Sequence, residues 1–365
     1  MTTQPIHRPG RPHPALSRRA LLAGTAAGAV GLSLAACGKG KKSGSQGDSK
    51  TVTVVTHDSF HVSEDLQKAF TSETGYTLKV ATSGDAGALV NKLVLTKDAP
   101  LGDAVFGIDN TYATRALDQG VIDTSATVTL PKGAESYVVA DTPALAPIDV
   151  GDVCLNIDTG YFTGKGLTPP ATFEDLTKPE YKGLLVAINP TNSSPGMAWL
   201  LATIGHFGAG SFADYWKQLA AGGARIAEDW TTAYETDFSA GGKGTYPIVV
   251  SYASSPSFTV SDDGASSSTS ALLDTAFRQV EYAGVLKGAA NPEGGKAFVT
   301  WMLSKAVQED IPGQMYMYPV LPDAALPEAL TKFGPLSKSP VKVDPKEITT
   351  HREEWLNTWT EAVGK

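Results

Sequence analysis

The clearest fold signal in the chain is the stretch TVTVVTHDSFHVSEDLQKAFTSETGYTLKVA, Thr51–Ala81. Its first residues, Thr51–Thr56, are rich in β-branched side chains, which is typical of a strand. Apolar residues recur at helical spacing across Glu64–Glu73, and Gly75 follows as a helix stop. Tyr76–Ala81 returns to a strand pattern. A strand, a helix and a second strand in this order predict a parallel βαβ unit.

The same alternation continues along the rest of the chain. We expect further strands at Asp103–Phe106, Leu184–Ile188, Ala224–Ala227, Tyr246–Ser251 and Val280–Ala283, with another beginning near Asp149. We expect helices at Ala86–Thr96, Thr111–Gln119, Gly196–Phe207, Phe212–Ala220, Thr231–Ser239, Pro292–Leu303 and, as an amphipathic closing helix, Thr350–Val363. Ser261–Ala271 is expected to be a surface loop. Because the chain is too long for one small core, these patterns predict an α/β protein of two lobes, each a mostly parallel sheet flanked by helices.

The N-terminal segment follows the order of a secretory signal. Arg18 and Arg19 precede an uncharged run of apolar and small residues that ends in LAAC, Leu34–Cys37. Paired arginines suggest the twin-arginine route, and LAAC resembles a bacterial lipobox, whose cysteine carries lipid. We therefore predict a signal peptide at residues 1–36, a lipid anchor at Cys37 and a flexible polar tether at residues 37–50. The alternative is an ordinary transmembrane helix, for which the run is short.

The charge balance of the chain is acidic. Its formal net charge is −8, and removal of residues 1–36, which hold four arginines and no acid, would leave −12. This balance argues against nucleic-acid binding, which needs a basic surface. It would mildly favour a cationic small ligand, although solubility alone is a sufficient explanation. We therefore expect no nucleic-acid partner.

Signatures of catalysis and of metal binding are absent from the sequence. GGKGT at Gly241–Thr245 lacks the spacing of a Walker loop, and neither GxSxG nor HExxH occurs. His57 and His61 are four apart but flank a predicted strand end, which disfavours a metal pair. Cys154 has no disulfide partner if Cys37 carries lipid, and it is expected to be a small buried hydrophobe. We expect no enzymatic activity, no cofactor and no metal.

Polar and aromatic residues gather where the predicted strands end. They are His57 to Ser59, Ser83 to Asp85, Gly107 with Asp109 and Asn110, Asn189 to Ser194, Glu228 to Trp230, and Tyr252 to Pro256. Ligands of open α/β sheets bind beyond the carboxyl ends of the strands. Any one of these segments could be only a turn, but together they predict a binding cleft.

Two of these strand ends suggest specific chemistry. Ser194 as the N-cap and Pro195 as the first residue form a strong helix start, whose amides and dipole can seat an anion. The same pattern also fits a capped helix without a ligand. Trp230 and Tyr252 follow neighbouring strands and can face a flat cationic ring, where cation–π contact contributes up to about 2 kcal/mol. Core packing is the usual fate of a lone tryptophan, so both interpretations stay open here.

Seven motifs occur in order from about Thr51 to the C-terminus: VVTHDSFHVSEDLQKAFTSETG, GDAGALVNKL, DAVFGIDNTYATRALDQG, NPTNSSPGMAWLLATIGHFG, EDWTTAYE, VVSYASSPSF and IPGQMYMYPV. They resemble the thiamine-binding proteins of bacterial ABC importers. The resemblance implies a two-lobed, type II periplasmic-binding fold that closes on thiamine or its phosphates in the cleft between the lobes. The wider group includes binders of ferric ion, spermidine and aminophosphonates.

The resemblance also assigns ligand contacts to residues of this sequence. They are Asp85 and Ala86, Ser193 and Ser194, Trp230, and the strand-end segment Tyr252, Ala253, Ser254, Ser255 and Pro256. On this assignment Asp85 pairs with the cationic or aminopyrimidine part, Trp230 and Tyr252 stack, and the serines bind the hydroxyethyl or phosphate end. Asp109, in the GIDN motif, is included in the expected site.

Three positions of the expected site depart from well-known members of that family. His57 replaces a tyrosine, Phe258 lacks a hydroxyl, and Tyr316 replaces a tryptophan. These departures leave the choice between thiamine and a phosphate ester open.

The resulting prediction is a monomeric solute-binding lipoprotein on the outer face of the cell membrane, which delivers thiamine or its phosphate to an ABC importer permease. The first lobe is expected to comprise residues 51–147 and about 262–315, and the second residues 148–261 and about 316–365. Alternatives are the same fold with ferric ion, a polyamine or an aminophosphonate, or a secreted hydrolase that uses Cys154 or paired acids.

Overall fold

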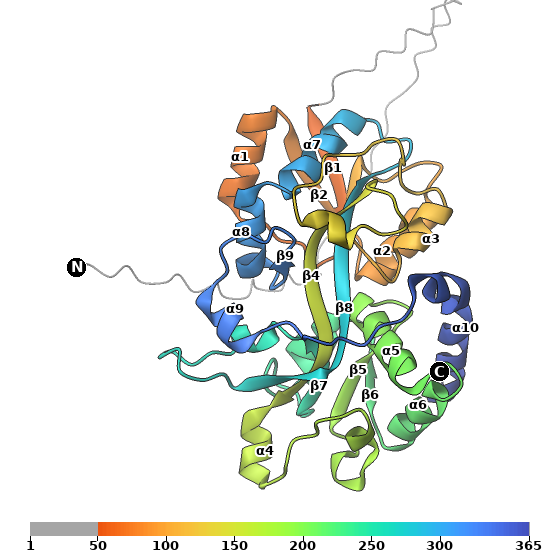
Figure 1. The fold of residues 1–365 in the computed structure, drawn as a ribbon, viewed down its shortest axis with the longest axis vertical. Helices are drawn as coiled ribbons and strands as arrows, with labels where there is room; N and C mark the ends of the chain where they lie inside the picture. Colours follow the sequence, from red (N-terminus) through yellow and green to blue (C-terminus); the bar gives the residue numbers. More distant parts are fainter. Residues whose placement is uncertain (1–49, 365) are drawn as a thin grey trace, which may run out of the picture. The chain divides into compact units, whose positions relative to one another are not determined.

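Strands and helices alternate along the chain largely as the sequence predicts (Figure 1). The computed structural model describes residues 50–364, so the predictions for the signal segment and Cys37 lie outside the described residues. The strands are β1 (Thr51–Thr56), β2 (Thr77–Thr82), β3 (Ala104–Asp109), β4 (Leu145–Asp158), β5 (Leu185–Ile188), β6 (Arg225–Ala227), β7 (Ile248–Tyr252), β8 (Thr269–Val285) and β9 (Tyr318–Pro319).

The α-helices are α1 (Glu64–Thr74), α2 (Ala86–Leu95), α3 (Ala113–Asp118), α4 (Thr159–Lys165), α5 (Ser194–Phe207), α6 (Phe212–Ala221), α7 (Pro292–Met302), α8 (Lys305–Gln314), α9 (Glu328–Phe333) and α10 (Pro345–Val363). Short 3-10 helices are η1 (Ala134–Tyr137), η2 (Glu174–Thr177), η3 (Pro179–Tyr181) and η5 (Ser255–Phe258), and η4 (Thr232–Asp237) is a π-helix. No helix in the described part of the chain is both long and apolar enough to span a membrane.

The strands of residues 50–364 form one nine-stranded sheet in the order β2-β1-β3-β8-β4-β7-β5-β6, with β9 paired to β4. Pairing is parallel at both ends, where β1 pairs with β2 and β3 and where β5 pairs with β6 and β7. It is antiparallel at the centre, where β8 pairs with β3 and β4, and β4 pairs with β7. Parallel pairing is therefore confirmed for the two ends of the sheet, and an antiparallel pair of strands joins them.

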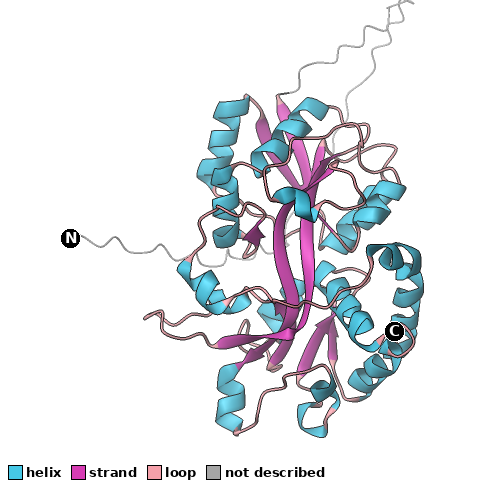
Figure 2. Cartoon of the chain, in the orientation of Figure 1, coloured by secondary structure: helices cyan, strands magenta, loops and turns pink. Residues whose placement is uncertain are grey.

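The two central strands are longer than the sequence pattern indicates. That pattern predicts a strand only at Val280–Ala283, but β8 begins at Thr269, inside the segment expected to be a loop. β4 is buried along almost its whole length, and its register with β8 shifts near Pro147 and Leu155. Such bulges bend a strand and increase its twist. Figures 1 and 2 show both strands running between the two parallel ends. The lobe boundaries given above stay a prediction.

The closing helix α10 packs an apolar face against α6, as its sequence pattern predicts. Trp359 is buried, and its ring centroid lies 5.7 Å from that of Trp216 on α6. Trp216 in turn meets Trp199 of α5 edge-on at 5.1 Å. Because truncation of a buried aromatic to alanine costs about 3–5 kcal/mol, this cluster is a main source of stability for the C-terminal part of the fold.

Side-chain caps fix the first turns of α2 and α5. Asp85 caps α2 by accepting a hydrogen bond from the Ala86 amide at 2.7 Å. Ser193, not the predicted Ser194, caps α5, and its hydroxyl accepts from the Gly196 amide at 3.4 Å. The tandem serines explain the shift by one residue, because either hydroxyl suits an N-cap. Because α2 follows β2 and α5 follows β5 in the chain, both capped helices start near the carboxyl ends of strands.

Candidate ligand-binding site

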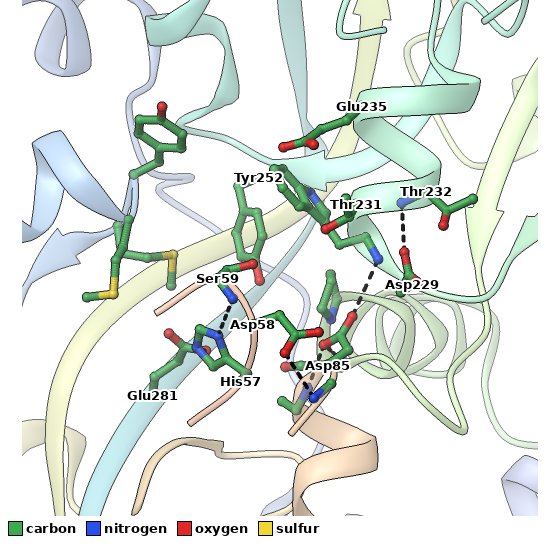
Figure 3. A pocket seen from close by; sticks show the side chains of 18 of the residues that line it. His57, Asp58, Ser59, Asp85, Asp229, Thr231, Thr232, Glu235, Tyr252 and Glu281 are labelled. Atoms are coloured by element: carbon green, nitrogen blue, oxygen red, sulfur yellow. Dashed lines mark hydrogen bonds and ion pairs between the residues drawn. The ribbon is translucent and has the colours of Figure 1, made fainter. Parts of the chain in front are cut away.

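A cavity of about 870 Å³ opens where several strand ends meet. Its wall is formed by segments after β1, β2 and β6, the first turn of α5, the end of β7 and residues 314–317. The predicted site residues that line it are His57, Asp85, Ala86, Ser194, Trp230, Tyr252, Ser254, Ser255 and Tyr316. Figure 3 shows His57, Asp85 and Tyr252 around the same space, together with Glu281. Residues from widely separated parts of the chain therefore converge on one cavity.

Asp85 lies at the junction of three segments of the cavity wall. One carboxylate oxygen accepts hydrogen bonds from the amides of Ala86 at 2.7 Å and Ser194 at 3.3 Å, and the other accepts from the Trp230 amide at 3.4 Å. Burial raises the pKa of this carboxyl, whereas hydrogen bonds from the Ser193 hydroxyl and the Ala86 amide lower it. The first turn of α5, where the sequence suggests an anion seat, therefore already faces a carboxylate of the protein.

His57 is held in one orientation beside the cavity. Its Nδ1 accepts a hydrogen bond from the Ser59 amide at 3.1 Å, which leaves the ring proton on Nε2. Nε2 lies 3.3 Å from a carboxylate oxygen of Glu281. The ring packs over Gly107, where φ is +96° and a Cβ would collide with the imidazole. Burial lowers the pKa of His57, but nearby carboxylates, Glu281 first, raise it more, so that the pKa lies above its ordinary value.

Three carboxyl groups form a row across the centre of the sheet, which we call the acid row. Asp109 of β3 and Asp149 of β4 are each paired in register with Glu281 of β8, so their side chains share one face of the sheet. Asp109 and Asp149 are 0 % exposed and Glu281 is 5 % exposed. Burial raises the pKa of Asp109 to about 7 and, together with Glu281, raises the pKa of Asp149 well above its ordinary value. Asp109 and Asp149 of the acid row therefore hold their protons to a higher pH than ordinary aspartates do.

Trp230 and Tyr252 line the cavity, and each is also fixed by contacts within the protein. Trp230 stacks on Tyr234 with ring centroids 5.1 Å apart and planes 9° apart, and its Nε1–H donates to the Ser251 hydroxyl at 3.0 Å. The Tyr252 hydroxyl donates to Gln279 Oε1 at 3.3 Å. Both rings are only partly buried. Fixed aromatic rings of this kind can receive a flat ligand without losing much conformational freedom.

Two serine hydroxyls of the cavity wall are buried without a partner. Ser194 Oγ and Ser254 Oγ make no hydrogen bond within residues 50–364, although both residues line the cavity. The Ser255 hydroxyl, in contrast, bonds with the Ser251 hydroxyl at 2.9 Å. Buried polar groups are normally paired, so the first two hydroxyls are suited to a polar group of a ligand.

The cavity wall is acidic. Carboxylates from six residues line it: Asp58, Asp85, Glu228, Asp229, Glu235 and Glu281. No lysine or arginine of the described residues is in this wall. Low-dielectric walls with charges of one sign focus the field, so the site favours a cationic ligand over an anionic one. Within residues 50–364 no three His, Cys, Asp or Glu side chains are placed to hold a metal ion.

Comparison with known proteins identifies the family. Residues 103–334, more than half of the chain, match the sequence profile described as bacterial extracellular solute-binding protein. The chain belongs to the bacterial extracellular solute-binding proteins.

Two curated relatives of this solute-binding protein are both described as thiamine-binding periplasmic proteins. The thiamine-binding periplasmic protein of Salmonella typhimurium is 26% identical over 326 residues, which cover 86% of this chain and 94% of the relative. The thiamine-binding periplasmic protein of Escherichia coli is 27% identical over 324 residues, with the same coverage of each chain. These similarities confirm the resemblance drawn from the motifs.

Solved structures place this solute-binding protein among the type II periplasmic binding proteins. A periplasmic thiamin binding protein matches with a TM-score of 0.75 and 25% identity, over 86% of this chain and 96% of that one. Iron-bound HitA from Pseudomonas aeruginosa matches with a TM-score of 0.66 and 20% identity, over 86% and 99% of the two chains. The second likeness shows the fold alone, and the predicted fold class is confirmed.

Five predicted site residues lie outside the cavity wall of this solute-binding protein. Ser193 is behind it, where its hydroxyl bonds to Asp85, and Asp109 is in the acid row. Ala253 is packed beneath the end of β7, and Pro256 is buried in η5. Phe258 is 39% exposed and contacts Tyr316 at the rim. Their part in binding stays a prediction.

The thiol considered as a nucleophile is not part of the cavity wall. Cys154 is buried and free, and burial raises the pKa of its thiol. A thiol, rather than a thiolate, is the form present at neutral pH, and thiols are poor nucleophiles. The relatives are solute-binding proteins, and this geometry fits the same role.

Several residues of the cavity wall were not identified from the sequence. They are Ala88, Thr231, Thr232, Glu235, Glu281, Gln314, Met315 and Met317. Glu281 carried one usable signal, since a lone acid inside the predicted strand Val280–Ala283 is unusual in a buried position. The methionines carried no such signal, because Met commonly fills irregular core gaps.

Proposed function

We propose that this solute-binding protein captures thiamine, or a phosphate ester of it, outside the cytoplasm and delivers it to an ABC importer permease. Cys37, which lies outside the described residues, would carry the lipid that holds the protein at the membrane. The proposal rests first on the cavity: a wall of carboxylates with Trp230 and Tyr252, in which the described residues include no lysine or arginine. Thiamine combines a cationic ring with a flat aminopyrimidine, and this wall offers a counter-ion and aromatic surfaces to it.

The dimensions of the cavity support a ligand of this size. Its volume of about 870 Å³ lies within the range of about 300–1,000 Å³ found for small-molecule sites. The unpartnered hydroxyls of Ser194 and Ser254 suit the hydroxyethyl end of the ligand. The curated relatives, described as thiamine-binding, add a separate line of support.

The assignment of ligand contacts follows from the cavity and is part of the proposal. Trp230 and Tyr252 would stack on the rings, and Asp85 would act on the cationic or aminopyrimidine part. The strands that join the two ends of the sheet, β4 and β8, would connect the two lobes and permit them to close. No step of catalysis is proposed, because the family to which the chain belongs binds solutes.

The proposal is tested by calorimetry on purified protein that begins at residue 50, with thiamine, thiamine monophosphate and thiamine diphosphate as titrants. We expect one-to-one binding of at least one of them. Native mass spectrometry of the freshly purified protein should show the same ligand retained from the cell. Recovery of an unchanged ligand after prolonged incubation would agree with binding, whereas its conversion would contradict a purely binding role. Failure of all three titrants to bind would overturn the proposal.

A further inference from the structure

Glu281 reaches the cavity from the centre of the sheet rather than from a strand end. It belongs to β8, is 5 % exposed and lines the cavity (Figure 3). Its Oε1 accepts a hydrogen bond from Gln279 Nε2 at 3.3 Å and lies 3.3 Å from His57 Nε2. Hydrogen bonds from donors stabilise the charged form of a carboxylate. Glu281 is therefore the member of the acid row that lines the cavity and presents its carboxylate there.

The charge of Glu281 has no fixed cation to balance it. Its ion-pair partner within residues 50–364 is His57, a titratable imidazole whose Nδ1 accepts the Ser59 amide, rather than a permanently charged lysine or arginine. A buried carboxylate without a cation is costly. A ligand cation that enters the cavity would supply the missing charge.

The other carboxylates of the wall are more exposed than Glu281, and four of them accept hydrogen bonds from the protein. Asp85 accepts three backbone amides. Glu228 accepts the side-chain amides of Asn189 at 2.9 Å and Asn192 at 3.0 Å. Asp58 and Asp229 accept the amides of Gly84 at 3.0 Å and Thr232 at 2.7 Å. Each of these four carboxylates therefore already has at least one neutral amide donor from the protein, and Glu235 is exposed at the rim.

We propose that Glu281 is the counter-ion for the cationic group of the ligand, and that His57 is a positioning residue that holds Glu281 toward the cavity. This inference rests on the proposed function, since it takes thiamine as the cationic ligand. It adds a binding residue that lies outside the strand-end motifs. It also assigns a positioning role to His57, one of the three positions that depart from the family pattern.

The experiment compares two ligands of the same shape that differ in charge. The probes are thiamine and a neutral analogue in which a thiophene ring replaces the thiazolium. Wild-type protein should bind thiamine about tenfold or more tightly than the analogue, because a charge-assisted contact is lost. Glu281→Gln should weaken thiamine binding by about tenfold or more and leave the affinity for the analogue within about threefold, so the preference for the cation disappears.

Two further variants separate the counter-ion from general charge and from general packing. Glu235→Gln removes the same unit of charge from the exposed rim, and it should reduce the preference for thiamine much less than Glu281→Gln does. His57→Gln keeps a polar side chain but changes the donor toward Glu281, and it should lower the same preference part of the way. A merely structural role of His57 would lower the affinity for both ligands equally.

The outcomes distinguish this inference from the proposed function. If wild-type protein binds thiamine and the neutral analogue with equal affinity, thiamine binding stands and the counter-ion proposal is overturned. The same holds if Glu281→Gln keeps the full preference for the cation. If wild-type protein binds neither ligand, both proposals fail. The wild-type comparison alone can overturn the inference, so the result does not depend on the folding of any variant.

Discussion

The Asp85 carboxylate and the Ser194 amide lie 3.3 Å apart although 109 residues separate them in the chain. Asp85 also caps α2, so one carboxylate stands at the N-termini of two helices. An anion at this end of a helix is stabilised by the helix dipole and by the free amides of the first turn. The two helix starts are thereby joined at the wall of the cavity.

Asp85→Asn should weaken thiamine binding by roughly tenfold or more, because a hydrogen bond to a charged group contributes about 1.5–3 kcal/mol. Asparagine keeps an acceptor for the Ala86 amide, so the cap of α2 should survive. Calorimetry measures the affinity. Asp344→Asn is the matched control, because Asp344 caps α10 through the Lys346 amide at 2.8 Å and is not in the cavity wall. An affinity equal to that of wild type would remove Asp85 from the site.

The rule that ligands bind beyond the carboxyl ends of strands located much of the cavity wall from the sequence. The run Thr51–Thr56 is β-branched and forms β1 with the predicted bounds, so the position of His57 beyond its end followed directly. Trp230, which follows β6, and Tyr252, which is the last residue of β7, were located in the same way. Local patterns suffice in these cases because each residue lies beside the element that positions it.

The parts that were missed depend on contacts between distant segments. The contact of Asp85 with α5 joins residues that no local pattern connects, so the first turn of α5 looked open to a ligand anion. Glu281 lies in the predicted strand Val280–Ala283, but the polar neighbours Arg278 and Gln279 obscured the earlier part of β8, which lies between β3 and β4 in the sheet. Tertiary pairing overrides local strand signals in this way.

Cys37→Ser should release the protein from the membrane, because the lipid is attached through the cysteine thiol in the lipobox interpretation. The measurement is the partition of the protein between the membrane fraction and the soluble fraction after washing without detergent. The natural control is Cys154→Ser, since Cys154 is buried in the fold and should not change the partition. A Cys37→Ser variant that stays with the membrane would show the lipobox interpretation to be wrong.

Ligand affinity and ligand-free stability should respond to pH in opposite directions. A cation beside the acid row favours its deprotonated forms, so thiamine affinity should rise between about pH 6 and 8, by at most tenfold per pH unit for each proton released. Asp109, with a pKa of about 7, titrates in this range. The pKa values of Asp149 and His57 are also raised above their ordinary values. Asp58, Asp85 and Glu281 are the carboxylates that face His57.

The direction in which the free energy of unfolding changes with pH follows from the raised pKa of Asp109. Its pKa is about 7 in the folded chain and about 3.9 in an unfolded one, so the folded chain holds the proton longer. The free energy of unfolding, compared with Asp109→Asn, should therefore fall as pH rises from about 4 to 7. Urea unfolding at several pH values measures it. A difference that is constant across this range would contradict the raised pKa.

Tyr252→Ala should weaken thiamine binding by about 1–3 kcal/mol, the magnitude of stacking on a flat base, because the ring lines the cavity and is only partly buried. The ligand-free melting temperature should fall only modestly. Since the stabilisation by a ligand follows RT ln(1 + [L]/Kd), a tenfold weaker site loses about 1.4 kcal/mol of it at saturation. Melting with and without thiamine therefore gives both quantities in one experiment.

Tyr282→Ala is the control for the effect of losing a core tyrosine on ligand-free stability and on the thiamine-induced shift. Tyr282 is also on the sheet, but it is 2 % exposed, and its hydroxyl donates to the Tyr137 carbonyl at 2.9 Å. Its truncation should cost about 3–5 kcal/mol of stability and leave the thiamine-induced shift near that of wild type. If Tyr252→Ala instead shows this second pattern, with a collapsed ligand-free melting temperature and a normal shift, then Tyr252 supports the end of β7 and does not contact the ligand.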